Sequence, residues 1–194
     1  HRRCLYEPIF FRAARPRHRR LTAVAWVAWL VNRPIAGSGG QATVYARARA
    51  VARAGHRCTF HMPGQYGDRI EAFRAMLAAW YGIDGRDVFA GTGGAGGADL
   101  LMVTDWGGLS AAGGLRPRRL AQFLQDQEAS FRAAGDEMLR LEAAPIVGAA
   151  TICLGNWLRG SFAERYARPA FGITFGADAA IYRPDPAVER EDRV

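Results

Sequence analysis

The chain has 194 residues, of which 49% are hydrophobic, 23% are charged and 11% are aromatic. This length suffices for one full hydrophobic core, and the composition excludes a disordered chain and a fibrous repeat. The formal net charge is +8, every basic residue is an arginine, and residues 1–20 alone hold seven arginines against one acidic residue. We therefore expect a basic arm over residues 1–20, one globular domain over residues 21–184 and a polar linker over residues 185–194.

The basic arm has two interpretations, a solvated chain end or a peripheral contact with an anionic membrane surface. No basic patch with interleaved aromatic residues continues beyond the arm, so nucleic acid is not an expected partner.

The three cysteines, Cys4, Cys58 and Cys153, lie far apart and form no C-x-x-C motif. This spacing predicts neither a zinc site nor a disulfide framework, and it favours small core residues in a reducing compartment. We expect a cytoplasmic protein, which lies at the inner face of the membrane if the arm contacts lipid.

The clearest pattern is a strand, turn, helix and strand that follow the arm. An apolar run predicts a first strand over residues 22–30, and a glycine-containing turn over residues 31–40 leads into an amphipathic helix over residues 41–54. Gly55 is suited to end that helix, and residues 57–62 predict a second, parallel strand. The first run could also be the apolar part of a signal peptide, but it begins well inside the chain and no clear A-x-A cleavage site follows it.

Further strands and helices alternate along the rest of the chain. The predicted strands are residues 88–90, 99–104, 120–124, 150–154 and 171–175, and the predicted helices are residues 68–81, 137–147 and 156–167. A second glycine cluster, residues 91–97, follows no strong strand and is predicted to be a flexible surface loop. The alternation predicts an α/β fold with a doubly wound, mostly parallel, Rossmann-like sheet.

The first glycine turn, residues 37–42, is one candidate ligand site. Glycines before a helix let backbone N–H groups approach an anion, so a phosphate near Gly39, Gly40 and Gln41 is one hypothesis. The string also matches G-x-G-x-x-A, the fingerprint of nicotinamide and flavin enzymes. That fingerprint requires an acidic residue at the end of the second strand, and residues 59–63 contain none. A dinucleotide-dependent oxidoreductase is therefore the weaker alternative, and a tight turn without a ligand is a third.

Polar residues that follow three predicted strands form the second candidate site. The candidate binding residues are Thr104, Trp106, Gln125, Gly155 and Asn156, and the candidate general bases are Asp105, Asp126 and Glu128. Ligands bind at the carboxyl ends of the strands in open α/β sheets, and carboxylates beside aromatic rings suit sugar hydroxyls. A helix N-cap is the alternative role for Asp105, Asp126 and Asn156. The histidines at 56 and 61 form no recognisable metal or triad pattern, so no metal or cofactor is expected.

Several segments form a further pattern when they are taken in chain order. They are Gly39-Gly40-Gln41, Ala54-Gly55-His56, Thr104-Asp105-Trp106, residues 123–128, residues 152–158, residues 175–178 and Tyr182-Arg183-Pro184. Their order and spacing resemble the N-terminal domain of bacterial glycosyltransferases of the GT-B fold. The most similar group is the rhamnosyltransferases that build surface-layer and other cell-surface glycans, and the resemblance spans about residues 21–184.

The resemblance implies a function for the chain. In that family the first domain mainly receives the acceptor glycan, a second Rossmann-like domain binds the nucleotide sugar, and transfer occurs between them. It implies that Gly39, Gly40 and Gln41 lie near the donor phosphates and that Asp105 and residues 125–128 face the acceptor. The donor would be a nucleotide sugar such as dTDP-rhamnose.

The position of Val194, just after the expected interdomain linker, leads us to expect that the donor-binding domain is missing and that this chain alone is inactive. A non-catalytic carbohydrate-binding module with the same fold is the alternative from a different functional class.

Overall fold

A seven-stranded sheet forms the centre of the molecule, with the strand order β3-β2-β1-β4-β5-β6-β7. All neighbouring strands are parallel. The computed structural model describes residues 24–112, 114–143, 149–174, 176 and 187–188, so the basic arm and most of the predicted linker lie outside it. The strands are β1 (Trp26–Leu30), β2 (Arg57–Met62), β3 (Val88–Ala90), β4 (Leu100–Val103), β5 (Leu120–Leu124), β6 (Ala150–Leu154) and β7 (Ala170–Ile173).

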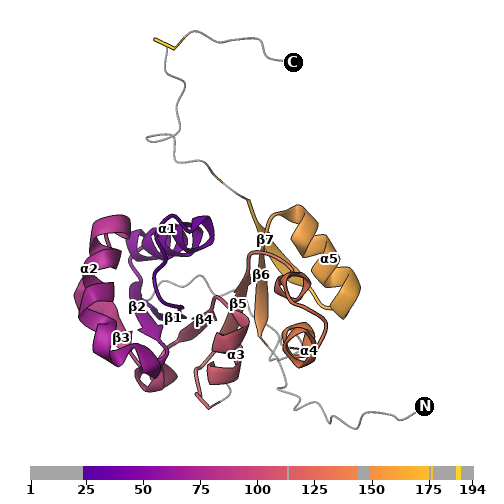
Figure 1. Ribbon diagram of the computed structural model, residues 1–194, viewed down its shortest axis with the longest axis horizontal. Coiled ribbons are helices and arrows are strands. Elements are labelled where there is room, and N and C mark those ends of the chain that lie inside the picture. The colour runs from indigo at the N-terminus through magenta and orange to yellow at the C-terminus, as the bar shows by residue number, and fades with distance from the viewer. Residues whose placement is uncertain (1–23, 113, 144–148, 175, 177–186, 189–194) are drawn as a thin grey trace.

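Helices connect the strands and cover both faces of the sheet (Figure 1). The α-helices are α1 (Gly39–Arg53), α2 (Ile70–Tyr81), α3 (Trp106–Ala112), α4 (Asp136–Ala143) and α5 (Asn156–Tyr166). Short 3-10 helices are η1 (Gly64–Arg69), η2 (Gly85–Asp87), η3 (Gly93–Gly97) and η4 (Glu128–Phe131).

The two faces have separate hydrophobic clusters because side chains alternate along a strand. Trp29 of β1 and Phe60 of β2 belong to one cluster together with Val44 of α1 and Phe73 of α2. On the opposite face, Leu30 and Val103 pack with Leu109 of α3, and Cys153 of β6 packs with Leu158 and Phe162 of α5. These contacts confirm the predicted α/β class and the doubly wound, Rossmann-like sheet.

The strand order places a topological switch point between β1 and β4. From β1 the chain continues through α1 on one face, whereas from β4 it continues through α3 on the other face. The connections diverge, so a gap forms above the carboxyl ends of these two strands, where open α/β sheets bind ligands. Both candidate sites from the sequence lie along this edge.

The predicted bounds of β2, β3, β5 and β6 are confirmed. The predicted strands 22–30, 99–104 and 171–175 correspond to β1, β4 and β7, whose bounds differ from the prediction at one or both ends. Helix α3 was not predicted. The glycine cluster 91–97 lies partly at the surface, as predicted, since Gly93, Gly94 and Gly97 are exposed, but it contains the short helix η3, whose Ala95 is fully buried in the same cluster as Leu30. Gly97 lies beside the Trp26 ring of β1, which is 3.5 Å from the position that a Cβ atom would take.

Both described cysteines are buried, as expected for core residues, and Cys4 lies outside the described residues. Burial raises the pKa of the Cys153 thiol to about 11. Within the part of the chain that the structure describes, no helix has the length and apolar character needed to cross a membrane.

Candidate functional site

Two cavities lie at the carboxyl edge of the sheet. The first, which we call the β1–β4 crevice, has a volume of about 180 Å³. Its walls include Asn32, Ser38, Gly40, Gln41, Tyr45, Thr104, Asp105 and Gln125. Two strands and the first turn of α1 converge here, so the crevice corresponds to the ligand position expected at a switch point.

The first turn of α1 is held by its own polar side chains. The Gln41 backbone N–H donates to Ser38 Oγ at 3.3 Å, which caps the helix. The Gln41 side chain donates from Nε2 to the Arg33 carbonyl at 2.7 Å and accepts at Oε1 from the Ile35 N–H at 2.8 Å. Gln41 therefore lines the crevice while its amide fixes the loop that precedes α1, a role that the sequence did not predict.

Gly40 brings α1 into close proximity with the end of β5. A Cβ atom at Gly40 would lie 3.3 Å from Gln125 Oε1, so a side chain at this position would require the end of the Gln125 side chain to shift slightly. Gly39, by contrast, has open space around its Cβ position and is absent from the crevice wall among the described residues. Of the two glycines, Gly40 has the closer relation to the candidate site.

Thr104 and Asp105, which follow β4, both have structural hydrogen bonds. Thr104 is buried and donates from Oγ1 to the Leu30 carbonyl at 2.8 Å, which ties β4 to β1. Asp105 Oδ1 accepts from the Gly108 N–H at 2.8 Å in the first turn of α3. The N-cap interpretation of Asp105 therefore holds, and the same carboxylate also lines the crevice.

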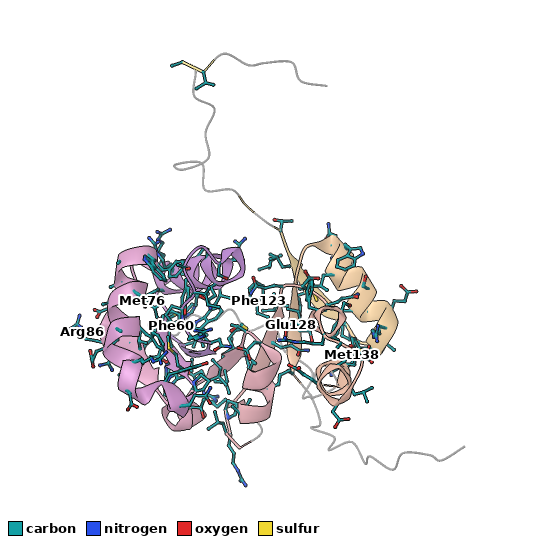
Figure 2. The ribbon with its side chains drawn as sticks, viewed as in Figure 1. Phe60, Met76, Arg86, Phe123, Glu128 and Met138 are labelled. Atoms are coloured by element: carbon teal, nitrogen blue, oxygen red, sulfur yellow. The ribbon has the colours of Figure 1, made fainter. Side chains whose placement is uncertain are left out.

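The second cavity, which we call the β5–α5 cavity, lies on the α3 and α5 face of the sheet and has a volume of about 70 Å³. The end of β5, the η4 region, α4 and α5 contribute to its walls, and Figure 2 labels Glu128 in this region between β5 and α5. Its polar wall residues include Asp105, Gln122, Asp126, Glu128, Glu142 and Arg165, and its apolar ones include Leu158 and Phe162. The space suffices for several water molecules, each of which needs about 10–15 Å³.

Asp105 is common to the two cavities. The structure thus brings all three predicted bases, Asp105, Asp126 and Glu128, to one cavity. It brings Gly40, Gln41, Thr104 and Gln125 to the other, with Asp105 between the two groups.

Two further predicted site residues lie outside both cavities. Gly155 and Asn156 contribute to neither cavity wall, and the α5 N-cap position is Gly155, so Asn156 does not cap that helix. Trp106 begins α3, but its side chain is outside the described part of the structure.

Sequence reasoning missed several cavity residues, above all Gln122. This residue is 1% exposed in the middle of β5. Its Nε2 donates to Thr151 Oγ1 at 2.7 Å, while its Oε1 has no hydrogen-bond partner among the described residues. The signal was present in the sequence as a polar residue inside the apolar strand LAQFL.

Burial changes the pKa of one tyrosine at each cavity. In the β5–α5 cavity, burial is the main cause that raises the pKa of Tyr166, and Arg165 opposes the rise. In the crevice, burial raises the pKa of Tyr45, with a smaller contribution from Tyr81. Both hydroxyls therefore stay protonated at neutral pH. No group of side chains with metal-ligand character occurs among the described residues.

Two features disagree with a dinucleotide site at α1. Eight residues, 31–38, separate β1 from α1. The dinucleotide fingerprint instead requires a tight glycine turn directly after the strand. The end of β2 at Met62 is followed by Pro63 and Gly64, where the fingerprint requires an acidic residue for the ribose.

Comparison with known proteins does not place this chain in a family, so a proposal for its function has to rest on the residues of the site. No protein-family model matches this chain, and no curated protein matches it.

Proposed function

We propose that this chain is the acceptor-side domain of a glycosyltransferase, which moves a sugar from a nucleotide-activated donor to a glycan. The observation that carries the proposal is the position of Asp105. Its carboxylate lies in the wall shared by a crevice at a helix N-terminus and a cavity rich in carboxylates. A helix N-terminus favours phosphate, and carboxylates accept hydrogen bonds from sugar hydroxyls, so the two cavities suit the two substrates of such a reaction.

The proposed reaction gives a separate role to each of the two cavities that Asp105 lines. A carboxylate base removes the proton of an acceptor hydroxyl, the oxygen forms a bond to the anomeric carbon of the donor, and the bond to the nucleoside diphosphate breaks. We assign Asp105 as the first candidate base, with Asp126 and Glu128 as the others. The backbone near Gly40 would stabilise the negative charge that develops on the departing phosphate.

The proposal includes a second domain and a location. A nucleotide-sugar-binding α/β domain would close over the carboxyl edge of the sheet, and the donor would be dTDP-rhamnose or a related nucleotide sugar. The buried, unpaired thiols of Cys58 and Cys153 are compatible with a cytoplasmic reaction. A peripheral contact of the basic arm would bring this domain to a membrane-bound acceptor.

The first experiment sequences the gene beyond the codon for Val194 and titrates its product calorimetrically with dTDP- and UDP-sugars and with NAD. We expect a second α/β domain and binding of a nucleotide sugar but not of NAD. Glycan binding without nucleotide binding or transfer would instead support a carbohydrate-binding module, and binding of NAD would support an oxidoreductase.

Asp105→Asn then tests the base within the active product. Asparagine can still accept the hydrogen bond from Gly108, so α3 keeps its cap. We expect kcat to fall by about 10²–10⁴-fold. The matched control is Asp84→Asn, which alters another capping aspartate, bonded to the Arg86 N–H and remote from both cavities. Equal rates for the Asp105 variant and the control would remove Asp105 from the mechanism.

A further inference from the structure

A chain of buried hydrogen bonds ends at His61 of β2. His61 pairs with Leu30 of β1, so its side chain lies on the α3 face of the sheet. The Trp26 indole N–H donates to Thr59 Oγ1 at 2.9 Å, and Thr59 Oγ1 lies 3.0 Å from His61 Nε2. Thr59 is fully buried and His61 is 3% exposed. Among the described residues, His61 Nδ1 has no hydrogen-bond partner, so only one nitrogen of this buried imidazole is satisfied.

The direction of these hydrogen bonds determines which nitrogen carries the hydrogen. An indole N–H can only donate, so Thr59 Oγ1 accepts from Trp26, and its own hydrogen has His61 Nε2 as its acceptor within the described structure. Nε2 is therefore unprotonated, and the neutral ring carries its hydrogen at Nδ1. A second proton can bind only at Nε2, where it would displace the Thr59 hydroxyl hydrogen from its acceptor.

The surroundings of the ring also oppose a positive charge. Phe89 of β3 stacks on the ring at a centroid distance of 5.2 Å, its neighbour in β1 is the apolar Leu30, and η3 consists of glycine and alanine alone. The charged side chain that acts on the ring is Arg57 of β2, another cation. Burial is the main cause that lowers the pKa of His61, the backbone of Gly91 opposes this shift, and Arg57 adds to it.

The helix η3 covers this chain of hydrogen bonds with few buried contacts. A Cβ atom at Gly94 would lie 3.5 Å from His61 Cε1, and one at Gly97 would lie 3.5 Å from the Trp26 ring. Within η3 only Ala95 is buried, and its side chain is a single methyl group. Displacement of η3 therefore exposes little apolar surface, whereas exposure of the ring on the β3 side would break the pairing of β2 with β3.

We propose that η3 is an acid-sensitive cover on the α3 face of the sheet, which opens when His61 binds a proton at Nε2. The proton takes the place of the Thr59 hydroxyl hydrogen, and the charged ring reaches water once η3 moves away. At neutral pH the ring is uncharged and η3 stays in place. This device goes beyond the proposed function and does not depend on it, since neither His61 nor η3 lines a cavity wall.

The sign of the pH effect follows from the two states of the cover. In the open state His61 binds a proton at the ordinary pKa of a histidine, whereas burial lowers the pKa of the covered ring. The open state therefore binds more protons, and opening becomes more favourable as the pH falls below the ordinary value. The population of the open state rises by up to about tenfold for each pH unit, until the covered ring is protonated as well.

NMR-detected hydrogen exchange on the unmodified chain tests the cover. The reporter amides are Ala95 and Ala98, which donate to the Thr92 and Ala95 carbonyls at 2.9 and 3.1 Å. The reference amide is Gly155, which donates to the Ile173 carbonyl at 2.7 Å at the far side of the sheet. Between pH 7.5 and pH 5, the protection factors of the reporters should fall by about tenfold while that of the reference stays constant. Unchanged reporters, or an equal loss at the reference, would overturn the proposal.

His61→Gln removes the titrating group and keeps an oxygen that can accept from the Thr59 hydroxyl. In this variant the exchange of the two reporter amides should no longer depend on pH after correction for the intrinsic rate. His56→Gln is the matched control, because His56 is the other described histidine, precedes β2 and accepts from the Ala25 N–H at 3.2 Å. The control should keep the pH effect, and loss of the effect in both variants would remove His61 from its special role.

The ring nitrogens of His61 give a second readout on the unmodified chain, which decides the mechanism if His61→Gln does not fold. Nitrogen-15 chemical shifts distinguish a protonated from an unprotonated ring nitrogen. At pH 7.5 we expect a hydrogen at Nδ1 and none at Nε2, and as the pH falls Nε2 should gain its proton together with the loss of protection in η3. A hydrogen at Nε2 at pH 7.5, or protonation without any change in η3, would overturn the proposal.

Discussion

The hydroxyl of Tyr45 is a polar group that the fold buries without satisfying it. Tyr45 is 1% exposed, its ring stacks on that of Tyr81 at a centroid distance of 4.6 Å, and its Oη has no hydrogen-bond partner in the described structure. We expect Tyr45→Phe to raise the free energy of unfolding by about 1–2 kcal/mol. Folding of the variant no longer removes a hydroxyl group from water without giving it a hydrogen-bond partner. Urea denaturation at pH 7 measures the change.

Tyr66→Phe is the matched control for this prediction. The Tyr66 hydroxyl donates to Asn32 Oδ1 at 3.3 Å, so its removal should lower stability slightly or leave it unchanged. A loss of stability in Tyr45→Phe would show that its hydroxyl has a partner in solution, such as a water molecule in the β1–β4 crevice.

At the residue scale, the sequence predicted which polar groups lie at the sheet edge better than it predicted what they bind. Parallel strands end at one edge, so Asp105 and Asp126 could be placed from strand ends alone. The Gln41 amide could not be assigned to the loop before α1, because its two hydrogen bonds depend on the path of residues 33–35. Gln122 stands out as a polar residue in an apolar run, but a strand buried on both faces does not indicate what that polar side chain contacts.

At the scale of elements, α3 depends on a tight contact with β4. A Cβ atom at Gly108 would lie 2.7 Å from Val103 Cγ1, below any normal contact distance. Gly108→Ala should therefore destabilise the protein by about 1–3 kcal/mol, the usual cost of overpacking, although alanine is the better helix former. Thermal or urea unfolding of the variant measures the loss.

The variant Gly160→Ala separates the effect of the contact between Gly108 and Val103 from the effect of helix propensity. Gly160 lies in α5, where a new Cβ atom would meet nothing within 4 Å. This variant should be more stable by up to about 1 kcal/mol. Destabilisation of equal size in both variants would argue against the close packing of α3 on β4.

The elements that the sequence could predict are those whose ends follow from a local pattern. Strands β2, β3, β5 and β6 are continuous runs bounded by turn residues, so their ends follow from the local pattern. Helix α3 has the sequence WGGLSAA, whose glycines disfavour a helix in isolation. Its formation depends on the Asp105 cap, which the sequence offered only as an alternative role for that residue, and on packing against β4, which no local pattern contains. The short helix η3 was not predicted for a similar reason, since its glycines disfavour a helix in isolation.

At the scale of the whole molecule, one hydrophobic cluster extends across the sheet. It includes Val88 of β3, Trp29 of β1, Phe123 of β5 and Leu154 of β6, with Ile173 of β7 packed against it. Parallel ladders join the same strands without interruption. Loss of either edge of the sheet would expose apolar surface of the centre, so the two edges should not unfold independently.

We therefore expect a single unfolding transition. Tryptophan fluorescence reports chiefly on the centre of the sheet through the buried Trp29, and far-UV circular dichroism reports on all helices and strands, so their urea midpoints should coincide. An earlier transition by circular dichroism than by fluorescence would mean that elements away from β1, such as β6, β7 and α5, open first as a separate unit. In that case the β5–α5 cavity would open with them, since α5 forms part of its wall.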